Sequence, residues 1–168
     1  MQSLGLTPAV LFGKDESSNN FSLYQTNFTY FPRYNFVENE NSSVSIGAPV
    51  GAGVGIVNSS TGDPGVGFSF DLPAVLDYNI GCKSTPENET YFGGYFGAGF
   101  GYSRNSVSGS SYTNMTASSY GPLLRAGVRI GSAKESFKGH AITIGFFYKK
   151  GLEAAKYNTA GCNVLVDL

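Results

Sequence analysis

Charge and metal-binding side chains are scarce in this 168-residue chain. Charged residues make up 14% of it, the formal net charge is −1, and it holds one histidine and two cysteines. So little charge supplies neither the basic cluster that binds nucleic acid nor a long-range field that attracts acidic substrates. Cys82 and Cys162 are too few for a disulfide framework and lack a histidine at metal-ligand spacing, so no metal or other cofactor is expected.

Long apolar runs are also missing. No stretch reaches the roughly 18 apolar residues that a membrane-spanning helix requires, which excludes such a span. No secretory signal is present, yet Met1, Gln2 and Ser3 lead abruptly into an alternating stretch, as a start codon placed on a processed chain would. We therefore expect a mature chain from which a signal peptide has been removed.

The chain is instead rich in glycine, and apolar residues alternate strictly with small or polar ones along much of it. In VSIGAPVGAGVGI, residues 44–56, every even position is apolar and the odd positions are Ser, Gly or Pro. Successive residues of a strand point to opposite faces, so this pattern predicts one long strand with an apolar face and a nearly bare one. Seven further stretches alternate with the same parity: 4–12, 21–36, 66–80, 91–103, 120–130, 142–148 and 160–168.

The shared parity constrains the turns. Paired residues of two antiparallel strands point to the same face, so here each pair consists of two even-numbered or two odd-numbered residues. The number of residues between them in the chain is then odd, so two-residue turns are excluded unless a bulge intervenes. The stretch NSVSGSSYTNMTAS, residues 105–118, is the longest expected loop. Loops on a rigid scaffold commonly carry recognition, so Tyr112 and Met115 are candidate recognition residues.

Side-chain volume indicates which face is inside. The even face carries too many Phe, Tyr, Leu and Ile side chains for the interior of an eight-stranded barrel, whereas the glycine-rich odd face fits it. Apolar residues outside and polar residues inside are typical of outer-membrane barrels. The sequence thus predicts one all-β domain, residues 1–168, forming an eight-stranded antiparallel up-and-down transmembrane β-barrel.

This pattern resembles the small eight-stranded outer-membrane barrels, such as the OmpA transmembrane domain and OmpX. The runs FGGYFGAGFGY, RAGVRIG and FYKKGLE are similar to barrels of this type from Bacteroidetes. The resemblance spans the whole chain but consists of alternation, so it specifies architecture and not activity. It implies a bacterial outer-membrane location with both termini in the periplasm, although Leu168 stands where the family usually has a terminal aromatic residue.

In that topology the aromatic residues of the lipid face sort into two girdles, as membrane interfaces favour. The outer girdle comprises Tyr24, Tyr102, Tyr120 and Tyr148, and the inner girdle comprises Tyr34, Phe36, Tyr78 and Phe92.

The odd face of the strands carries charges that would lie in the lumen. They are Arg33, Asp71, Asp77, Arg125, Arg129, Lys149 and Asp167. Buried charges persist when they are paired and hydrogen-bonded, so we expect pairs across the lumen that close it. A structural plug is favoured over a selective ion path.

The sequence holds no catalytic constellation. His140, the single histidine, falls at the expected periplasmic rim with no Asp or Ser fixed beside it. The GAGVG and GAGFG runs lie within strands, whereas a dinucleotide loop lies between a strand and a helix. Both cysteines are expected to be unbonded thiols.

These features favour a non-enzymatic outer-membrane barrel with a plugged polar lumen. Its role would be structural or protein-interacting, either alone or as an accessory subunit of a larger outer-membrane complex. Expected partners are outer-membrane lipid, lipopolysaccharide and other outer-membrane proteins, and not nucleic acid. The alternatives are a narrow ion-conducting pore, an outer-membrane lipid-modifying enzyme and a soluble lipocalin-like binder.

Overall fold

The computed structural model describes residues 1–14, 20–58, 65–109, 112–131, 139–152 and 157–168. The described residues form nine strands: β1 (Gln2–Lys14), β2 (Asn20–Asn39), β3 (Ser42–Gly47), β4 (Val50–Asn58), β5 (Gly65–Gly81), β6 (Phe92–Gly109), β7 (Tyr112–Gly131), β8 (Ala141–Lys149) and β9 (Asn158–Asp167). In this part of the chain, no helix has the length and hydropathy needed to cross a membrane.

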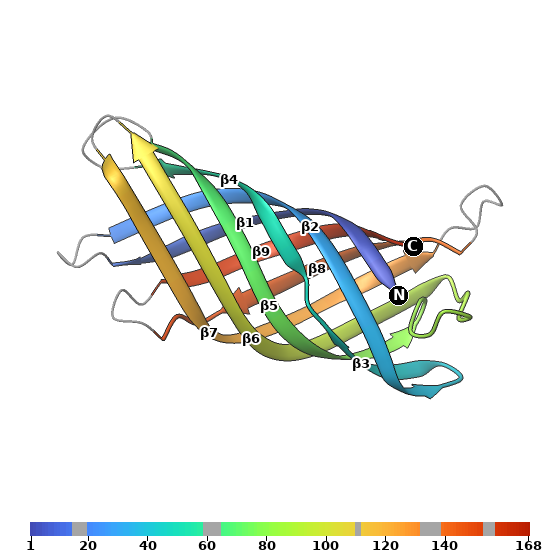
Figure 1. Ribbon diagram of the computed structural model, residues 1–168. Coiled ribbons are helices and arrows are strands. Elements are labelled where there is room, and N and C mark those ends of the chain that lie inside the picture. The colour runs from blue at the N-terminus through green and yellow to red at the C-terminus, as the bar shows by residue number, and fades with distance from the viewer. Residues whose placement is uncertain (15–19, 59–64, 110–111, 132–138, 153–156) are drawn as a thin grey trace.

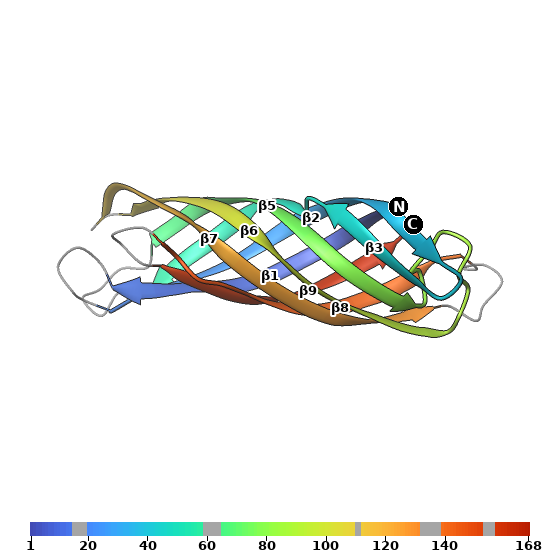
Figure 2. The ribbon, with the colours of Figure 1, turned by 90° about the horizontal axis from the view of Figure 1, so that it is seen from below.

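The strands close into a ring of antiparallel neighbours. β1 pairs with β2 on one side and with β9 on the other, and the remaining strands follow chain order. β3 and β4 both lie between β2 and β5, so together they form one strand of an eight-stranded barrel. The strands incline to the long axis of a cylinder (Figures 1 and 2). The predicted fold class is confirmed.

The expected strand 44–56 is interrupted at Ala48 and Pro49. Proline has no N–H and cannot donate to the ladder, so pairing stops there. Ala48 still donates its N–H to the carbonyl oxygen of Pro32, at 3.2 Å. The register against β2 is the same before and after the break, which makes the interruption local.

Even-numbered side chains face outward and odd-numbered ones face inward. The large apolar side chains that the structure leaves exposed are even-numbered throughout, apart from Val37 and Tyr91. Along β5 buried and exposed residues alternate from Gly65 to Gly81. The alternative of a soluble barrel with its even face inside is therefore wrong, because that face forms the outer wall.

Bulges allow two-residue turns between strands whose outward-facing residues are all even-numbered. Between β2 and β3 the register slips from Asn35 to Val37, so Phe36 is the extra residue and a two-residue turn, 40–41, follows. The pairing of β6 with β7 slips in the same way beyond Val107. The slip reverses parity, which explains why Val37 is exposed although its number is odd.

The expected long loop at 105–118 is wrong. β6 continues to Gly109 and β7 begins at Tyr112, so most of this stretch is a hairpin in which Val107 pairs with Met115. Ser, Thr and Asn occupy both faces of the hairpin, so the apolar alternation ends while backbone pairing continues. Tyr112 and Met115 therefore lie on β7 rather than in a loop, and their side chains lie outside the described part of the structure.

Both chain termini lie at one end of the barrel (Figure 1), called here the termini end. The turn between β2 and β3 and residues 82–91 lie at the same end. The β6–β7 hairpin turns back at the opposite end, called the loop end.

Candidate functional site

The inward side chains divide the lumen into three layers along the barrel axis. The charge cluster lies nearest the termini end and contains Arg33, Asp77, Arg125, Arg129 and Asp167. The apolar layer comes next and contains Phe31, Val75, Leu123 and Leu165, with Phe147 packed against it. The polar chamber lies beyond it toward the loop end and is lined by Asp71 and Lys149.

Two loose ion pairs organise the charge cluster. Arg125 Nε lies 3.5 Å from Asp77 Oδ1, and Arg129 Nε lies 3.5 Å from Asp167 Oδ2. These separations exceed the usual N–H···O range of about 2.7–3.2 Å. Asp167 also accepts hydrogen bonds from Ser3 and from Thr143, the latter at 2.5 Å. Among the described residues, neither Asp77 carboxylate oxygen has a hydrogen-bond donor, so this charge depends on Arg125.

Arg33 and Arg129 converge on the same two acceptors. Asn79 Oδ1 accepts from Arg33 at 2.8 Å and from Arg129 at 2.9 Å. The carbonyl oxygen of Lys83 accepts from the same two guanidinium groups, at 2.9 Å and 3.4 Å. The two like charges are thus held together by neutral oxygen atoms instead of by a shared carboxylate.

Tyr95 sits between the arginines. The guanidinium carbons of Arg125 and Arg129 lie 4.6 Å and 5.0 Å from the centre of its ring, which is cation–π distance. Gly145 leaves the space that the ring occupies, because a Cβ there would lie 2.0 Å from the Tyr95 hydroxyl oxygen. Arg125 also covers the ring of Phe31 at 4.6 Å and so links the charge cluster to the apolar layer.

The turn after β5 folds into the mouth of the barrel at the termini end. Residues 82–85 are all buried although they follow the end of a strand. The carbonyl oxygen of Ser84 accepts hydrogen bonds from Ser43 Oγ at 2.5 Å and from Asn35 Nδ2 at 2.8 Å. Lys83 adopts a left-handed backbone conformation with φ 53°, which is unusual for a residue with a side chain. The turn therefore closes the mouth over the charge cluster.

Each member of the apolar layer precedes a charge of the cluster on the same strand. Phe31 lies two residues from Arg33, Val75 from Asp77, Leu123 from Arg125 and Leu165 from Asp167, always on the side of the loop end. These four apolar side chains are at most 6% exposed and contact one another across the lumen. The layer therefore lies between the charge cluster and the polar chamber, although Arg125 reaches past it and also lines the cavity of the chamber.

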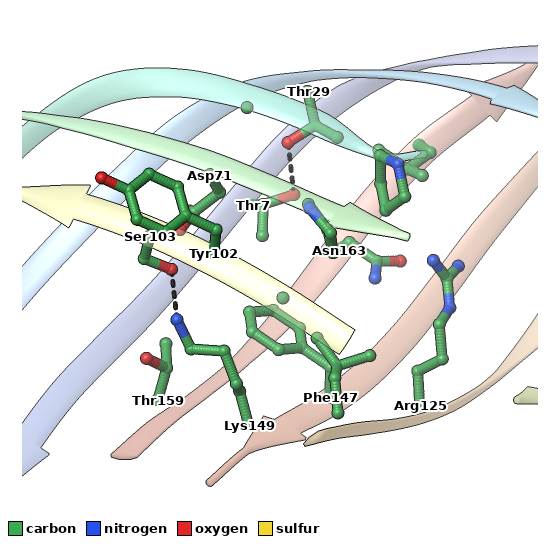
Figure 3. A pocket seen from close by; sticks show the side chains of 16 residues that line it. Thr7, Thr29, Asp71, Tyr102, Ser103, Arg125, Phe147, Lys149, Thr159 and Asn163 are labelled. Atoms are coloured by element: carbon green, nitrogen blue, oxygen red, sulfur yellow. Dashed lines mark hydrogen bonds between the residues drawn. The ribbon is translucent and has the colours of Figure 1, made fainter. Parts of the chain in front are cut away.

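The polar chamber encloses a cavity of about 50 Å³. Asp71 accepts hydrogen bonds there from Gln25, at 2.9 Å, and from Asn27. Lys149 donates to Ser103 Oγ at 2.5 Å and to the carbonyl oxygen of Ser119 at 3.2 Å. Figure 3 shows Lys149 and Ser103 at the cavity wall. A volume of this size holds a few water molecules and no larger ligand.

The seven predicted lumen charges therefore fall into two groups. Five lie in the charge cluster, and Asp71 and Lys149 lie in the polar chamber. Asp77 meets Arg125 and Asp167 meets Arg129, whereas Arg33 contacts amide and carbonyl oxygens.

The predicted girdle residues lie on the outer wall. All eight are exposed: Tyr24, Tyr34, Phe36, Tyr78, Phe92, Tyr102, Tyr120 and Tyr148. Tyr102 and Tyr120 are direct partners on β6 and β7, and the rings of Tyr78 and Phe96 lie 5.7 Å apart. From Phe92 to Tyr102 β6 rises about 34 Å along the strand. At a tilt of about 40° this is roughly 25 Å along the axis, the height of the apolar band in outer-membrane barrels.

His140 and the cysteines form no reactive group with the described side chains. His140 Nδ1 lies 3.2 Å from the carbonyl oxygen of Asp167. Cys82 and Cys162 are free thiols, as predicted. In the described ranges no three His, Cys, Asp or Glu side chains gather in a way that could hold a metal ion.

Sequence reasoning missed the apolar layer, Tyr95 and the inserted turn. The layer had a signal, because Phe31 and Leu123 are bulky apolar residues at odd positions where small or polar ones prevail. Tyr95 is likewise a bulky residue at an odd position, among glycines. The turn 82–85 had none, since its contacts are made by backbone carbonyl oxygens.

Comparison with known proteins identifies the fold. No protein-family model matches the sequence, and no curated protein is similar to it. Among solved structures, Ail, the attachment invasion locus protein of Yersinia pestis, in complex with the heparin analogue sucrose octasulfate, is 14% identical over 98% of this chain and 96% of its own, with a TM-score of 0.54. Neisserial surface protein A is 10% identical over 98% and 94%, with a TM-score of 0.52.

These neighbours have the fold of small outer-membrane β-barrels, and so does this chain. The predicted resemblance to small eight-stranded outer-membrane barrels agrees with them, as does a location in the bacterial outer membrane.

Proposed function

We propose that this protein is a non-enzymatic outer-membrane barrel that acts through its external surface and not through its lumen. The observation that carries the proposal is the closure of the lumen. The apolar layer crosses the lumen, the charge cluster fills the lumen between this layer and the termini end, and the turn 82–85 covers the mouth at the termini end. These three successive obstructions support a lumen that is closed to water and ions.

If the lumen is closed, the protein must act through the surfaces that lie outside the membrane. The most regular of these is the hairpin extension, the part of β6 and β7 beyond the outer girdle. Beyond the Tyr102–Tyr120 pair, β6 and β7 stay paired through Ser103–Ser119 and Ser106–Thr116 as far as Gly109–Tyr112. Paired strands hold their shape better than a loop does, because their backbone groups are hydrogen-bonded. With the termini in the periplasm, this extension projects from the cell surface and is suited to contact another protein.

The role is therefore structural or protein-interacting, and membership of a larger outer-membrane assembly is one form of it. The Ail structure was determined with a sulfated sugar analogue bound. A barrel of this fold can thus bind a ligand, which supports a binding role here.

A narrow pore is the second candidate, and one observation favours it. The polar chamber contains a cavity of about 50 Å³ with Asp71 and Lys149 at its wall. Conduction would require the apolar layer to part, since Phe31, Val75, Leu123 and Leu165 lie between this chamber and the termini end.

Site-specific photo-crosslinking in intact cells tests the surface role. A photoreactive residue at Ser106 or Thr116, exposed partners on the hairpin extension, should yield the same single protein adduct. A matched probe at Phe96, in the apolar band of β6, should yield lipid adducts alone. Equal protein adducts from Phe96, or none from either hairpin position in the folded barrel, would contradict an interaction through this extension.

A further inference from the structure

On the described strands and turns, exposed side-chain charges differ in sign between the two ends of the barrel. Among the side chains that the structure describes, the exposed carboxylates all lie at the termini end: Glu38, Glu40, Glu87 and Glu89. The exposed cations in the same part of the chain, Arg104 and Lys150, both lie at the loop end. The other charged side chains described on the strands point into the lumen or are buried.

Arg104 and Lys150 occupy equivalent places on the outer wall. Arg104 lies on β6 two residues beyond Tyr102, and Lys150 follows β8 two residues beyond Tyr148. All four have even numbers and exposed side chains, so they face outward. Each cation therefore lies just beyond an outer-girdle tyrosine, on the side away from the apolar band.

Tyr120 lies on the strand between the two cations. It is paired with Tyr102 on β6, and its carbonyl oxygen accepts from the N–H of Leu152 at 3.0 Å, just past Lys150. The N–H of Lys150 donates to the carbonyl oxygen of Pro122, also on β7, at 2.9 Å. Pro122 pairs with Phe100 on β6, so Lys150 is offset from Arg104 by four residues along the strands. With strands about 4.8 Å apart and a rise of about 3.3 Å per residue, the Cα atoms of the two cations lie roughly 16 Å apart, a gap that the long Arg and Lys side chains can narrow from both sides.

The two cations and the tyrosines beside them have the chemistry to bind a phosphate group at the membrane surface. Tyrosine rings settle where hydrocarbon meets headgroups, so the side chains just beyond them lie at headgroup depth. An arginine fork binds phosphate through two parallel hydrogen bonds, and lysine adds a second positive charge. The patch holds no carboxylate among its described side chains, and its tyrosine hydroxyl groups can donate further hydrogen bonds.

We propose that the headgroup patch, defined as Tyr102, Arg104, Tyr120, Tyr148 and Lys150, binds the phosphate group of an anionic lipid in the outer leaflet. The inference rests on the proposed membrane orientation and adds to it the class of lipid and the residues that hold it. The lipid would dock against β6, β7 and β8, with its acyl chains along the apolar band and its phosphate between the two cations. The exposed carboxylates described at the termini end would repel the same headgroup.

Binding of bisphosphorylated lipid A to the purified barrel in nanodiscs of zwitterionic lipid tests this site. Each cation near an anionic surface contributes roughly a fivefold change in affinity. Arg104→Gln and Lys150→Gln should each weaken binding about fivefold, and the double variant about 25-fold. The matched control, Glu38→Gln with Glu87→Gln at the opposite end, should leave the affinity unchanged.

Two further arms identify the ligand chemistry. Dephosphorylated lipid A should bind the wild type as weakly as the double variant binds the phosphorylated lipid, and inorganic phosphate should not compete. A folded double variant that binds phosphorylated lipid A as tightly as the wild type would overturn the proposal. Competition by inorganic phosphate would overturn it too, because the site would then take a free ion.

Failure of the lipid site and failure of the surface role give different results. If the variants fold and keep their hairpin crosslinks but lipid binding is unaffected, the lipid site alone is wrong. If lipid binding follows the cations while Ser106 and Thr116 give no protein adduct, the site stands and the interaction role falls.

Discussion

Gly53 on β4 offers a sharp test of the inward face. A Cβ built on it would lie 2.0 Å from the carbonyl oxygen of Thr26 and 2.6 Å from Asn27 Oδ1, well inside the 3.4 Å at which ordinary contact begins. Gly51, two residues away on the same face, would meet Asn27 and Thr29 side-chain atoms at 3.3 Å. The first clash is with the β2 backbone, which β1 and β4 hold in place on its two sides, whereas the second involves side-chain atoms that can adjust.

The two alanine variants should therefore differ in stability. Overpacking costs about 1–3 kcal/mol, and for Gly53→Ala we expect the upper limit because a backbone atom must move by more than 1 Å. For Gly51→Ala the cost is offset by about 0.4–1 kcal/mol from the lower entropy of the unfolded chain, so the net change should be close to zero. The same offset lowers the net cost of Gly53→Ala to about 2 kcal/mol. The two variants should therefore differ by about 2 kcal/mol, which is roughly a 30-fold change in the folding equilibrium constant.

Urea titration of the barrel in lipid vesicles, with the folded fraction read from heat-dependent gel mobility, measures this difference. The midpoint should fall for Gly53→Ala and stay near the wild-type value for Gly51→Ala. Equal midpoints for the two variants would refute the placement of Gly53 against β2. Gly51→Leu should also destabilise the barrel, because the larger side chain would enter the polar chamber.

Three further outcomes follow from the lumen and the mouth. Arg125→Met should destabilise the barrel by about 3–5 kcal/mol because it removes the ion-pair partner of the buried Asp77, and adding Asp77→Asn should recover much of the loss in the same urea titration. Leu123→Ala should cost about 2–5 kcal/mol through the cavity it leaves in the apolar layer. Burial raises the pKa of the Cys82 thiol, so less thiolate exists at a given pH and alkylation should be slow. Mass spectrometry should find Cys82 unmodified by N-ethylmaleimide at pH 8 in the folded barrel and modified after unfolding; rapid labelling of the folded barrel would contradict its burial.

The alternation predicted the two faces of the wall because every strand must satisfy the same pair of environments. Lipid demands apolar side chains, and a narrow interior demands small ones, so the parity of Val54 and Gly53 is sufficient to orient both. The same reasoning failed at Val37, where a bulge that no residue type announces reverses the parity. It also failed at 105–118, because strands that leave the membrane no longer need an apolar face and only their backbone pairing shows them as strands.

The lumen was less predictable than the wall. The sequence supplied the charges but not their grouping, which depends on the stagger of the strands around the ring. Arg33 illustrates this, since its partners are Asn79 and the carbonyl oxygen of Lys83 instead of a carboxylate. The apolar layer became visible only when Phe31, Leu123 and Leu165, far apart in the chain, were brought to one depth.

Single-channel recording in planar bilayers tests the closed lumen most directly. The wild-type barrel, shown to be folded by its gel mobility, should give no resolvable current steps across a range of voltages. The apolar layer and the inserted turn 82–85 are the physical reasons for this expectation. Steady ohmic steps from the folded wild type would contradict the account and establish the narrow pore in its place.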